Sequence, residues 1–360
     1  MKIVPVILAG GVGERFWPLS RQKRPKQLLS IISNRSMIEE TLRRARPLCT
    51  GGVRPLIVTG KAMAQGIARV VPKRVGYDKI VEPIGKNTAP AIAAAAVWIQ
   101  KKYGDAFMLV LPADHAVSPV KDFVAAVRYA AELADSNDCL CVFGIRPSRP
   151  ETGYGYIQVA DRLGARGGMK SFAVRRFVEK PSLQLAKTYV ALETYFWNSG
   201  MFIWKTSVIF DEIREHMPDL FRGATMLSKY AITASRINTF YRACRKESID
   251  YGIMEKSTRV AVVCPTFDWD DVGSWESLVR IHGYNRQNNT CVGGRIFDDE
   301  SSGSIIVNDS SLTVSACGLN NMAIVATDDA ILVVPRDKLP SLRQYIAAMK
   351  SNKRLPRSIF

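Results

Sequence analysis

The sequence has few histidines, no paired cysteine motif and no long hydrophobic run. Its three histidines, His115, His216 and His282, are dispersed, so we do not expect histidine-based catalysis. The seven cysteines are scattered and odd in number, and no two are spaced as C-x-x-C. This pattern argues against a disulfide framework or a zinc site. Unpaired cysteines are typical of proteins in a reducing compartment, and we expect a cytoplasmic protein.

Apolar stretches are too short for a membrane span, which needs roughly 18 consecutive apolar residues. The longest candidate covers residues 89–99, which is the length of a core helix. The N-terminal apolar run stops at Ala9 and passes into a glycine-rich loop, so we do not expect a secretory signal. Hydrophobic residues make up 47% of the chain and charged residues 23%, as in ordinary globular proteins.

Negative charge is scarce, because 33 Asp and Glu stand against 50 Lys and Arg, a formal net charge of +17. Such a charge suits anionic substrates, nucleic acid or a membrane surface. The basic residues are spread along the chain in small clusters, such as residues 43–46 and 350–357, rather than in one stripe. No recognised nucleic-acid-binding module accompanies them, so we interpret the charge as a solvated surface and do not expect nucleic acid as a partner.

The most informative stretch is the loop that follows the first predicted strand, residues 3–8. Three glycines fall within four positions of it: Gly10, Gly11 and Gly13. They allow a tight turn that brings bare N–H groups against an anion. Five cations follow on the same loop: Arg15, Arg21, Lys23, Arg24 and Lys26. The pattern predicts a polyphosphate ligand.

Two common phosphate-binding motifs do not match this loop. A dinucleotide fingerprint, G-x-G-x-x-G, would need glycine where the chain has Phe16. A Walker A loop, G-x-x-x-x-G-K-[ST], occurs nowhere in the sequence. The loop therefore belongs to another class of polyphosphate-binding sites.

Strand and helix signals alternate through about the first 280 residues, and this rhythm predicts an α/β fold with a mostly parallel sheet flanked by helices. Ligands of such sheets bind beyond the carboxyl ends of the strands. Three polar stretches fall there: residues 10–26, residues 82–90 and Asp114. We therefore expect them to share one site.

The pattern of predicted secondary structure changes after about residue 288. Short strand-like runs are separated by polar turns, and an amphipathic helix is predicted over residues 339–349. We expect two domains, residues 1–288 and a small β-rich unit with a closing helix over residues 289–360. A β-rich end with an amphipathic helix also favours a homodimer contact.

The motifs resemble the mannose-1-phosphate guanylyltransferases, a branch of the sugar-phosphate nucleotidyltransferases, over about residues 1–335. The resemblance rests on the loop Gly10–Gln27 and on the runs at residues 82–91, 112–115, 152–157, 177–181, 197–200, 248–255 and 268–275. Phe16, Lys86 and Asp270 stand where the family usually has leucine, arginine and serine, and the segment after Leu312 matches less well. The resemblance implies a Rossmann-like, GT-A-like catalytic domain with a small β-helix-like C-terminal unit. Some relatives carry a further isomerase domain, for which this chain is too short, so we do not expect isomerase activity.

The resemblance also implies an activity: GTP and α-D-mannose 1-phosphate give GDP-mannose and pyrophosphate by Mg²⁺-assisted in-line attack. A related enzyme that uses glucose 1-phosphate or another nucleoside triphosphate is an alternative within the class. A non-catalytic protein that binds a sugar nucleotide or nucleic acid is the alternative from another class. It would predict the loss of a phosphate or metal ligand, and none of the expected ligands is missing.

Several of the expected site residues also have a purely structural interpretation. Mg²⁺ prefers one or two carboxylates plus substrate phosphates, which Asp114 and Asp271 would provide, although each could simply cap a turn or helix. The expected catalytic residues are Arg15, Lys26 and Lys180, although Lys26 could instead be a solvated loop charge. The expected nucleotide-binding residues are Ala9, Gly10, Gly11, Gly13, Glu82, Asn87 and Thr88. The expected sugar-binding residues are Gly155, Glu179 and Asn198, although Glu179 and Lys180 could form a surface ion pair of little energetic weight.

Overall fold

The structure is a computed structural model that describes residues 1–11, 14–352 and 354–360. Its larger body is built on one nine-stranded sheet with the order β3-β2-β1-β4-β9-β6-β10-β8-β7. The strands are β1 (Ile3–Ala9), β2 (Leu56–Gly60), β3 (Asp78–Glu82), β4 (Phe107–Pro112), β6 (Leu140–Ile145), β7 (Tyr156–Arg166), β8 (Met169–Val178), β9 (Tyr195–Lys205) and β10 (Val260–Cys264). A short pair, β5 (Ala116–Ser118) and β11 (Asp268–Asp270), lies outside this sheet.

The sheet is mixed but mostly parallel, as the sequence predicts. Strands β1 to β4 run in one direction, β6 and β10 pair in parallel, and β8 and β9 run against their neighbours. The chain adds β2 and β3 on one side of β1 and then places β4 on the other. The carboxyl ends of β1 and β4 therefore form a topological switch point, where open α/β sheets bind ligands.

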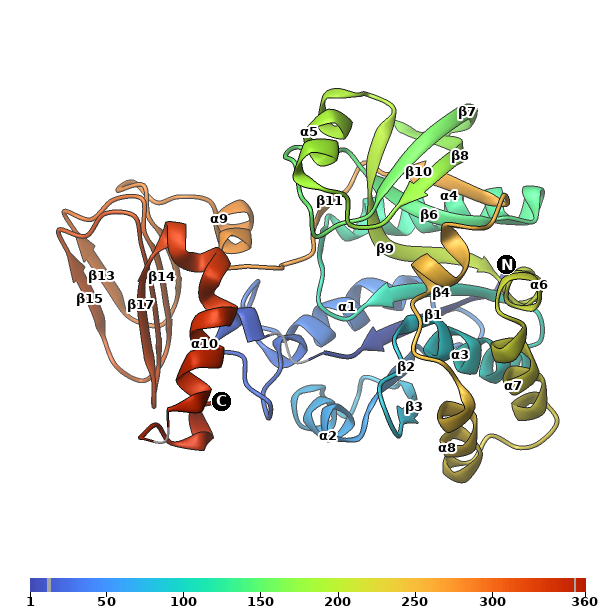
Figure 1. Ribbon diagram of the computed structural model, residues 1–360, viewed down its shortest axis with the longest axis horizontal. Coiled ribbons are helices and arrows are strands. Elements are labelled where there is room, and N and C mark those ends of the chain that lie inside the picture. The colour runs from blue at the N-terminus through green and yellow to red at the C-terminus, as the bar shows by residue number, and fades with distance from the viewer. Residues whose placement is uncertain (12–13, 353) are drawn as a thin grey trace.

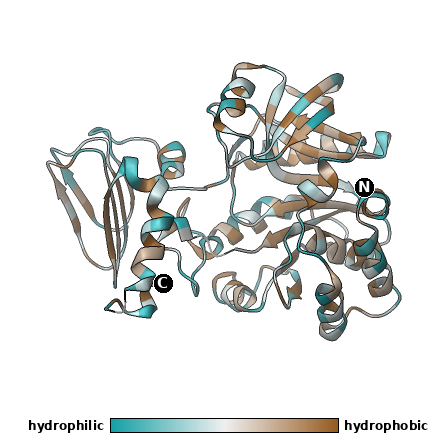
Figure 2. Ribbon diagram, viewed as in Figure 1, coloured by the Kyte–Doolittle hydropathy of each residue, from teal (hydrophilic) through white to brown (hydrophobic). Residues whose placement is uncertain are grey.

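Helices cover both faces of the sheet (Figure 1). They are α1 (Met37–Ala45), α2 (Lys61–Val70), α3 (Thr88–Tyr103), α4 (Val120–Asn137), α5 (Leu183–Ala191), α6 (Thr206–His216), α7 (Pro218–Ser228) and α8 (Ala234–Ala243). A further helix, α9 (Glu276–His282), lies apart from this sheet, beside the strands of the C-terminal part. Side chains alternate along β1, because Val4 and Val6 join a core with α3, α6, α7 and α8, whereas Ile3 and Ile7 join one with α1, α2 and α4. Figure 2 shows the same two layers as hydrophobic strands backed by hydrophobic helix faces.

The chain after α9 forms a second, smaller body of stacked strands. They are β12 (Thr290–Gly293), β13 (Ile296–Asp299), β14 (Ile305–Asp309), β15 (Val314–Cys317), β16 (Met322–Thr327) and β17 (Ile331–Pro335). β12, β14 and β16 pair in parallel in one sheet, with β17 antiparallel at its edge, and β13 pairs with β15 in another. Successive strands thus alternate between two sheets, as in a β-helix. We call this body the C-terminal coil.

A closing helix follows the coil, as expected. It is α10 (Leu342–Ser351), which begins three residues later than predicted because Arg336–Ser341, which includes Pro340, forms a 3-10 segment. Leu342 and Ile346 of α10 are buried within the chain, in a core that the two bodies share. The apolar side of this helix is therefore used inside the molecule, and it no longer argues for a dimer contact.

This shared core takes residues from both ends of the chain. Phe16, Trp17 and Leu19 of the glycine-rich loop pack with residues of β14, β16 and α10. The Trp17 indole N–H also donates a hydrogen bond to the Ile359 carbonyl, with 2.7 Å between the atoms. The loop is thus fixed between the large sheet and the C-terminal coil.

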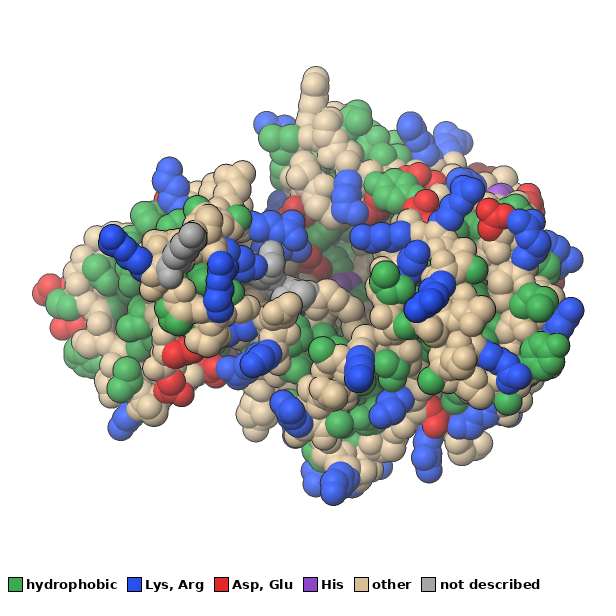
Figure 3. Space-filling model, turned by 60° about the horizontal axis from the view of Figure 1, so that its bottom comes forward, with side chains coloured by type: hydrophobic (Ala, Val, Ile, Leu, Met, Phe, Trp, Pro, Cys, Tyr) green, Lys and Arg blue, Asp and Glu red, His purple; other side chains and the backbone are tan. Residues whose placement is uncertain are grey.

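The excess positive charge is dispersed on the folded molecule. Figure 3 shows lysine and arginine side chains across the whole visible face rather than in one stripe. In the described part of the chain, no helix is both long and apolar enough to cross a bilayer.

Candidate active site

A cavity of about 700 Å³ opens at the carboxyl ends of β1 and β4. Eleven of the predicted site residues line it: Ala9, Gly10, Gly11, Glu82, Asn87, Thr88, Asp114, Gly155, Glu179, Asn198 and Asp271. Gly13 lies outside the described residues. The structure therefore brings together residues that are spread over most of the chain.

The start of the glycine-rich loop forms one wall of the cavity. Ala9 ends β1, and its carbonyl accepts a hydrogen bond from the Thr59 hydroxyl at 2.6 Å. Gly11 has a φ of +89°, a left-handed conformation that favours glycine. The Gln27 amide donates to the Gly10 carbonyl at 2.6 Å and closes the loop on itself. The backbone of Gly10 and Gly11 is left facing the cavity.

Two carboxylates and one buried lysine meet beside this wall. Lys26 is only 6% exposed, and its ammonium lies 3.1 Å from Asp114 Oδ2. The same ammonium donates to the backbone carbonyl of Asp271 at 2.6 Å. Asp271 Oδ1 in turn accepts hydrogen bonds from the Tyr154 hydroxyl at 2.6 Å and from the Gly273 N–H at 3.0 Å. Lys26 thus does not line the cavity itself but joins the Asp114 carboxylate to the backbone of Asp271, and both aspartates line the cavity.

The electrostatics of this group favour an ionised Asp114. Burial alone would raise the pKa of Asp114, but the nearby Lys26 ammonium offsets this and holds the pKa below its ordinary value. Asp114 therefore remains an anion at neutral pH. Within the described residues, no group of three or more His, Cys, Asp and Glu side chains is arranged to hold a metal by itself.

The opposite wall carries the predicted sugar-binding residues. Asn198, on β9, donates its backbone N–H to the Gly155 carbonyl at 2.8 Å. Glu179 lies directly against Gly155, because a Cβ built on Gly155 would come within 2.4 Å of Glu179 Oε2. Among the groups that the structure describes, this buried Oε2 atom has no hydrogen-bond partner. It is therefore free to accept a hydrogen bond from a ligand hydroxyl.

Asp250 is a site residue that sequence reasoning missed. It lines the cavity, and its Oδ1 accepts a hydrogen bond from the Asn198 amide at 2.9 Å. Burial and the nearby Glu179 carboxylate raise the pKa of Asp250 to about 6. Its run, residues 248–255, is one of the motifs of the family resemblance. That match was the signal that could have found it.

Glu82, Asn87 and Thr88 line a third side of the cavity. Burial raises the pKa of Glu82, although the nearby Tyr241 hydroxyl opposes the shift. Asn87 caps α3 by accepting from the Thr88 N–H at 2.9 Å, and the Thr88 hydroxyl accepts from the Ile249 N–H at 2.8 Å. Asn87 and Thr88 thus each make a structural hydrogen bond at the start of α3, and both residues also face the cavity.

His115 also lines the cavity, although we expected no catalytic role for it from the sequence. Its Nδ1 accepts a hydrogen bond from the Trp269 indole at 3.1 Å, which leaves the proton on Nε2. Burial lowers the pKa of His115 to about 4, so the ring is neutral at pH 7. A neutral imidazole can position a ligand group but carries no charge to neutralise a phosphate.

The other two predicted catalytic residues, like Lys26, lie outside the lining of the cavity. Arg15, on the short helical turn η1 (Glu14–Phe16), is exposed to solvent. The Lys180 side chain is 57% exposed, and its ammonium pairs with Glu179 Oε1 at 2.7 Å. Both would have to move toward a ligand in order to contact it.

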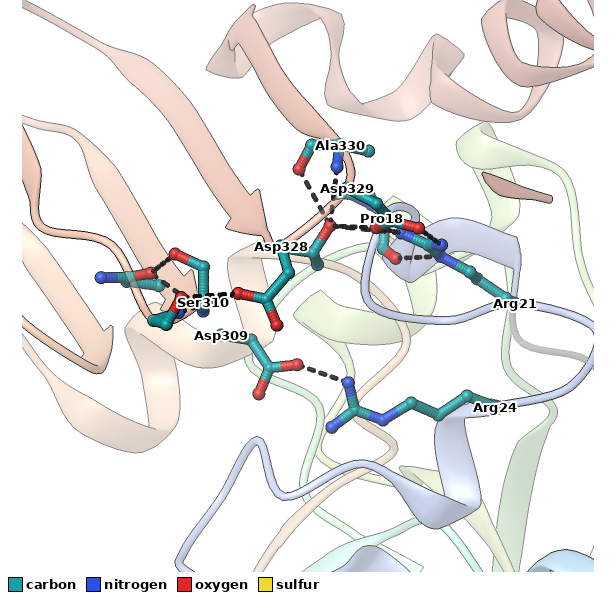
Figure 4. A network of polar contacts seen from close by, with 11 residues as sticks. Pro18, Arg21, Arg24, Asp309, Ser310, Asp328, Asp329 and Ala330 are labelled. Atoms are coloured by element: carbon teal, nitrogen blue, oxygen red, sulfur yellow. Dashed lines mark hydrogen bonds and ion pairs between the residues drawn. The ribbon is translucent and has the colours of Figure 1, made fainter. Parts of the chain in front are cut away.

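Two cations of the loop face away from the cavity, contrary to the expectation of one basic cluster. Arg21 pairs with Asp329 and Arg24 with Asp309, and both aspartates belong to the C-terminal coil (Figure 4). Their charges are therefore used in an internal contact rather than on a phosphate.

Comparisons with known proteins agree with this geometry. The nucleotidyl transferase family model matches residues 4–288. A mannose-1-phosphate guanylyltransferase of Salmonella muenchen is 37% identical over 98% of this chain and 74% of its own length. A xanthan biosynthesis protein of Xanthomonas campestris pv. campestris (strain B100) is 37% identical over 97% of this chain and 73% of its own length.

A solved structure from Thermus thermophilus, described as a mannose-1-phosphate geranyltransferase, has a similar overall fold. It is 32% identical, has a TM-score of 0.87, and the match covers 98% of this chain and all of that one. The chain therefore belongs to the nucleotidyl transferase family, in the branch of the mannose-1-phosphate guanylyltransferases.

Proposed function

We propose that this protein transfers GMP from GTP to α-D-mannose 1-phosphate and produces GDP-mannose and pyrophosphate. The observation that carries the proposal is the single cavity at the switch point of the sheet. It combines a glycine-rich loop, two aspartates whose carboxylate (Asp114) and backbone carbonyl (Asp271) meet one buried lysine, and a polar wall suited to sugar hydroxyls. The guanylyltransferase name of the Salmonella muenchen relative supports the choice of substrates.

In the reaction, a phosphate oxygen of mannose 1-phosphate attacks the α-phosphorus of GTP in line. The new P–O bond forms as the bond to the bridging oxygen breaks, and pyrophosphate leaves with the electron pair. Positioning and charge neutralisation suffice for such a transfer, and no covalent enzyme intermediate is needed. We assign the leaving pyrophosphate to Lys26 and Arg15 and the attacking phosphate to Lys180.

The donor set suits Mg²⁺, because Asp114 and Asp271 are carboxylates from distant stretches that face one cavity. Mg²⁺ prefers one or two carboxylates together with substrate phosphates. The Lys26 ammonium between Asp114 Oδ2 and the Asp271 carbonyl indicates that this position already favours a cation. When bound there, Mg²⁺ would supply charge neutralisation on the phosphates of GTP.

The remaining residues would recognise the two substrates. We assign the nucleotide to the backbone of Ala9, Gly10, Gly11 and Gly13 and to Glu82, Asn87 and Thr88. We assign the sugar to Gly155, Glu179 and Asn198, because Glu179 Oε2 is an acceptor without a partner among the described groups. A hydroxyl that donates to this oxygen would gain a charge-assisted hydrogen bond.

Three further expectations belong to this proposal. We propose a cytoplasmic protein, which the seven free cysteines support. We propose a division into a catalytic domain, residues 1–288, and a C-terminal domain, residues 289–360, which the separate sheets support. We also propose a homodimer whose contact lies outside the apolar side of α10, since that side is buried within the chain. Equilibrium sedimentation is the test, and the mass of a single chain would contradict the proposal.

The deciding experiment measures pyrophosphate release by the purified protein with Mg²⁺. GTP is compared with UTP, dTTP and ATP, and mannose 1-phosphate with glucose 1-phosphate. Asp271→Asn should abolish most turnover, whereas Asp268→Asn is the matched control, because Asp268 is exposed and lies on the same segment outside the cavity. Release that requires GTP and mannose 1-phosphate supports the proposal.

Release with another pair would keep the reaction class and change the substrate. No release with any pair would contradict the enzymatic proposal and favour a non-catalytic sugar-nucleotide-binding protein.

A further inference from the structure

The loop that carries Lys26 is held from outside by the C-terminal coil (Figure 4). Both guanidinium nitrogens Nη1 and Nη2 of Arg21 donate to the two carboxylate oxygens of Asp329. Nη2 also donates to the Thr327 hydroxyl at 3.2 Å. Arg24 pairs through Nη1 with Asp309. Two arginines of one loop thus meet two carboxylates of another body.

Asp309 and Asp329 both lie at one end of the sheet formed by β12, β14, β16 and β17. Asp309 ends β14, Thr327 ends the neighbouring parallel strand β16, and the two residues are partners in the strand register. Asp329 follows in the turn between β16 and β17, where its Oδ1 accepts from the Thr327 hydroxyl at 3.0 Å. Because paired strand ends move little relative to one another, the coil presents both carboxylates at a fixed spacing.

The arginines are in turn linked to the site through the backbone. The Arg21 N–H donates to the Arg24 carbonyl at 2.9 Å, and the Arg24 N–H donates back to the Arg21 carbonyl at 3.0 Å. This tight turn leads directly through Pro25 into Lys26, whose ammonium contacts Asp114 Oδ2 at 3.1 Å. A displacement of the turn would therefore displace Lys26.

We propose that Asp329 and Asp309 are positioning residues of the nucleotide site. They hold the Arg21–Arg24 turn, and with it the loop up to Lys26, in the conformation that binds the triphosphate before the nucleotide arrives. This inference rests on the proposed function and adds to it a role for two residues that lie outside the cavity.

The proposal predicts a specific kinetic signature. If the loop is competent in only a fraction of the molecules, the apparent affinity for the nucleotide falls by that fraction. Saturating nucleotide then captures the competent form, so kcat remains unchanged while KM rises. A substitution that only unfolded part of the protein would do the opposite, because it would lower kcat and leave KM unchanged.

The two pairs should contribute unequally. Arg21 is 15% exposed and binds its carboxylate in the two-pronged geometry that gives the stronger arginine–carboxylate pairs. Arg24 and Asp309 are 48% and 39% exposed and are joined through one nitrogen, so solvent screens this pair more.

The test compares Asp329→Asn, Asp309→Asn and the double variant in pyrophosphate release with varied GTP. We expect KM for GTP to rise about three- to tenfold in Asp329→Asn, less in Asp309→Asn and most in the double variant, with kcat unchanged. Asp328→Asn is the matched control. Asp328 is the adjacent carboxylate in the same turn, and it lines the cleft between the loop and the coil together with Asp309 and Asp329. Unlike them, it accepts hydrogen bonds from Ser311 within the coil.

A second readout does not depend on turnover. Release of the turn should speed trypsin cleavage after Arg21 and Lys23 in the double variant but not in Asp328→Asn, as mapped by mass spectrometry. An unchanged KM in a folded double variant would overturn the proposal, as would an equal rise in Asp328→Asn or a loss of kcat alone. If the unmodified protein shows no turnover, the proposed function fails first, and unchanged trypsin cleavage of the double variant would then overturn the loop contact as well.

Discussion

At the scale of single residues, Gly155 shows how closely the sugar side of the cavity is built. A Cβ on Gly155 would come within 2.4 Å of Glu179 Oε2 and 3.3 Å of Asn198 Cβ. The Glu179 side chain is only 10% exposed, so a methyl group at position 155 would displace it within a packed site. The absence of a side chain at position 155 is therefore part of how Glu179 is positioned.

We expect Gly155→Ala to raise KM for mannose 1-phosphate at least about tenfold, because a displacement of about 1 Å in a site can cost roughly a hundredfold. Steady-state kinetics with varied sugar phosphate would measure this. Gly153→Ala is the control, since the nearest contact of its Cβ would be Glu151 Oε1 at 3.4 Å. Equal effects of the two substitutions would contradict the role given to Gly155.

Asp250 should make stability depend on pH. Its pKa rises from 3.8 to about 6 through burial and Glu179, so the folded state binds the proton more strongly than the unfolded state. Stability therefore falls as pH rises from about 4 to about 6. Asp250→Asn keeps an acceptor for Asn198 but cannot ionise. We expect it to be more stable than the unmodified protein by about 1–3 kcal/mol at about pH 7.5 and equally stable near about pH 4.

Urea unfolding of both proteins at the two pH values would test this, because other titrating groups cancel in the difference. A constant difference across the pH range would show that Asp250 does not ionise in this window.

Most residues that line the cavity could be predicted from the sequence. The loop arginines that face away from it could not, for a physical reason. Gly10, Gly11 and Asp114 directly follow strands whose carboxyl ends must meet at one edge, so local sequence specifies their place. Arg21 and Arg24 look the same as Lys26 in sequence, since all three are cations on one loop. Their partners lie about 300 residues further along the chain, and no local pattern reports contacts at that separation.

At the scale of elements, the sequence predicts helices and strands whose hydrophobic residues recur regularly. It predicts less well those elements whose form depends on pairing with another segment. Ser36 and Glu39 have the spacing of a capping box in the sequence, and this capping box begins α1 in the structure. The long hairpin of β7 and β8 was visible only as strand-like fragments, because three register shifts interrupt its alternation. α9 begins at Glu276, and its N-cap is Trp275 rather than Ser274, the residue type that local sequence favours as a cap.

Helix α10 gives a test at this scale. Ile346 is 2% exposed in the core shared by the two bodies, whereas the neighbouring Tyr345 is 56% exposed. We expect Ile346→Ala to lower the free energy of unfolding by about 2–4 kcal/mol and Tyr345→Ala to change it by under about 0.5 kcal/mol. Chemical denaturation of the three proteins would measure both. A comparable loss in both variants would mean that α10 does not pack as described.

At the scale of the whole molecule, two bodies with separate sheets share one apolar core. Phe16, Trp17 and Leu19 would lose their cover if the C-terminal coil were removed. We expect a fragment that ends at residue 288 to bind a hydrophobic dye such as ANS and to lack turnover. Dye binding and circular dichroism of the fragment would test this. A fragment with full activity and no dye binding would show that the catalytic body is independent of the coil.

The hydrogen bond between Trp17 and Ile359 spans 342 positions of the chain. A ribosome makes Trp17 342 positions before its partner Ile359, so the glycine-rich loop lacks this cover while the segment between them is synthesised. Contacts of such long sequence range form late in folding. We therefore expect a nascent chain to gain catalytic competence only when the residues around Ile359 have emerged, which makes activity a report that synthesis has passed the C-terminal coil.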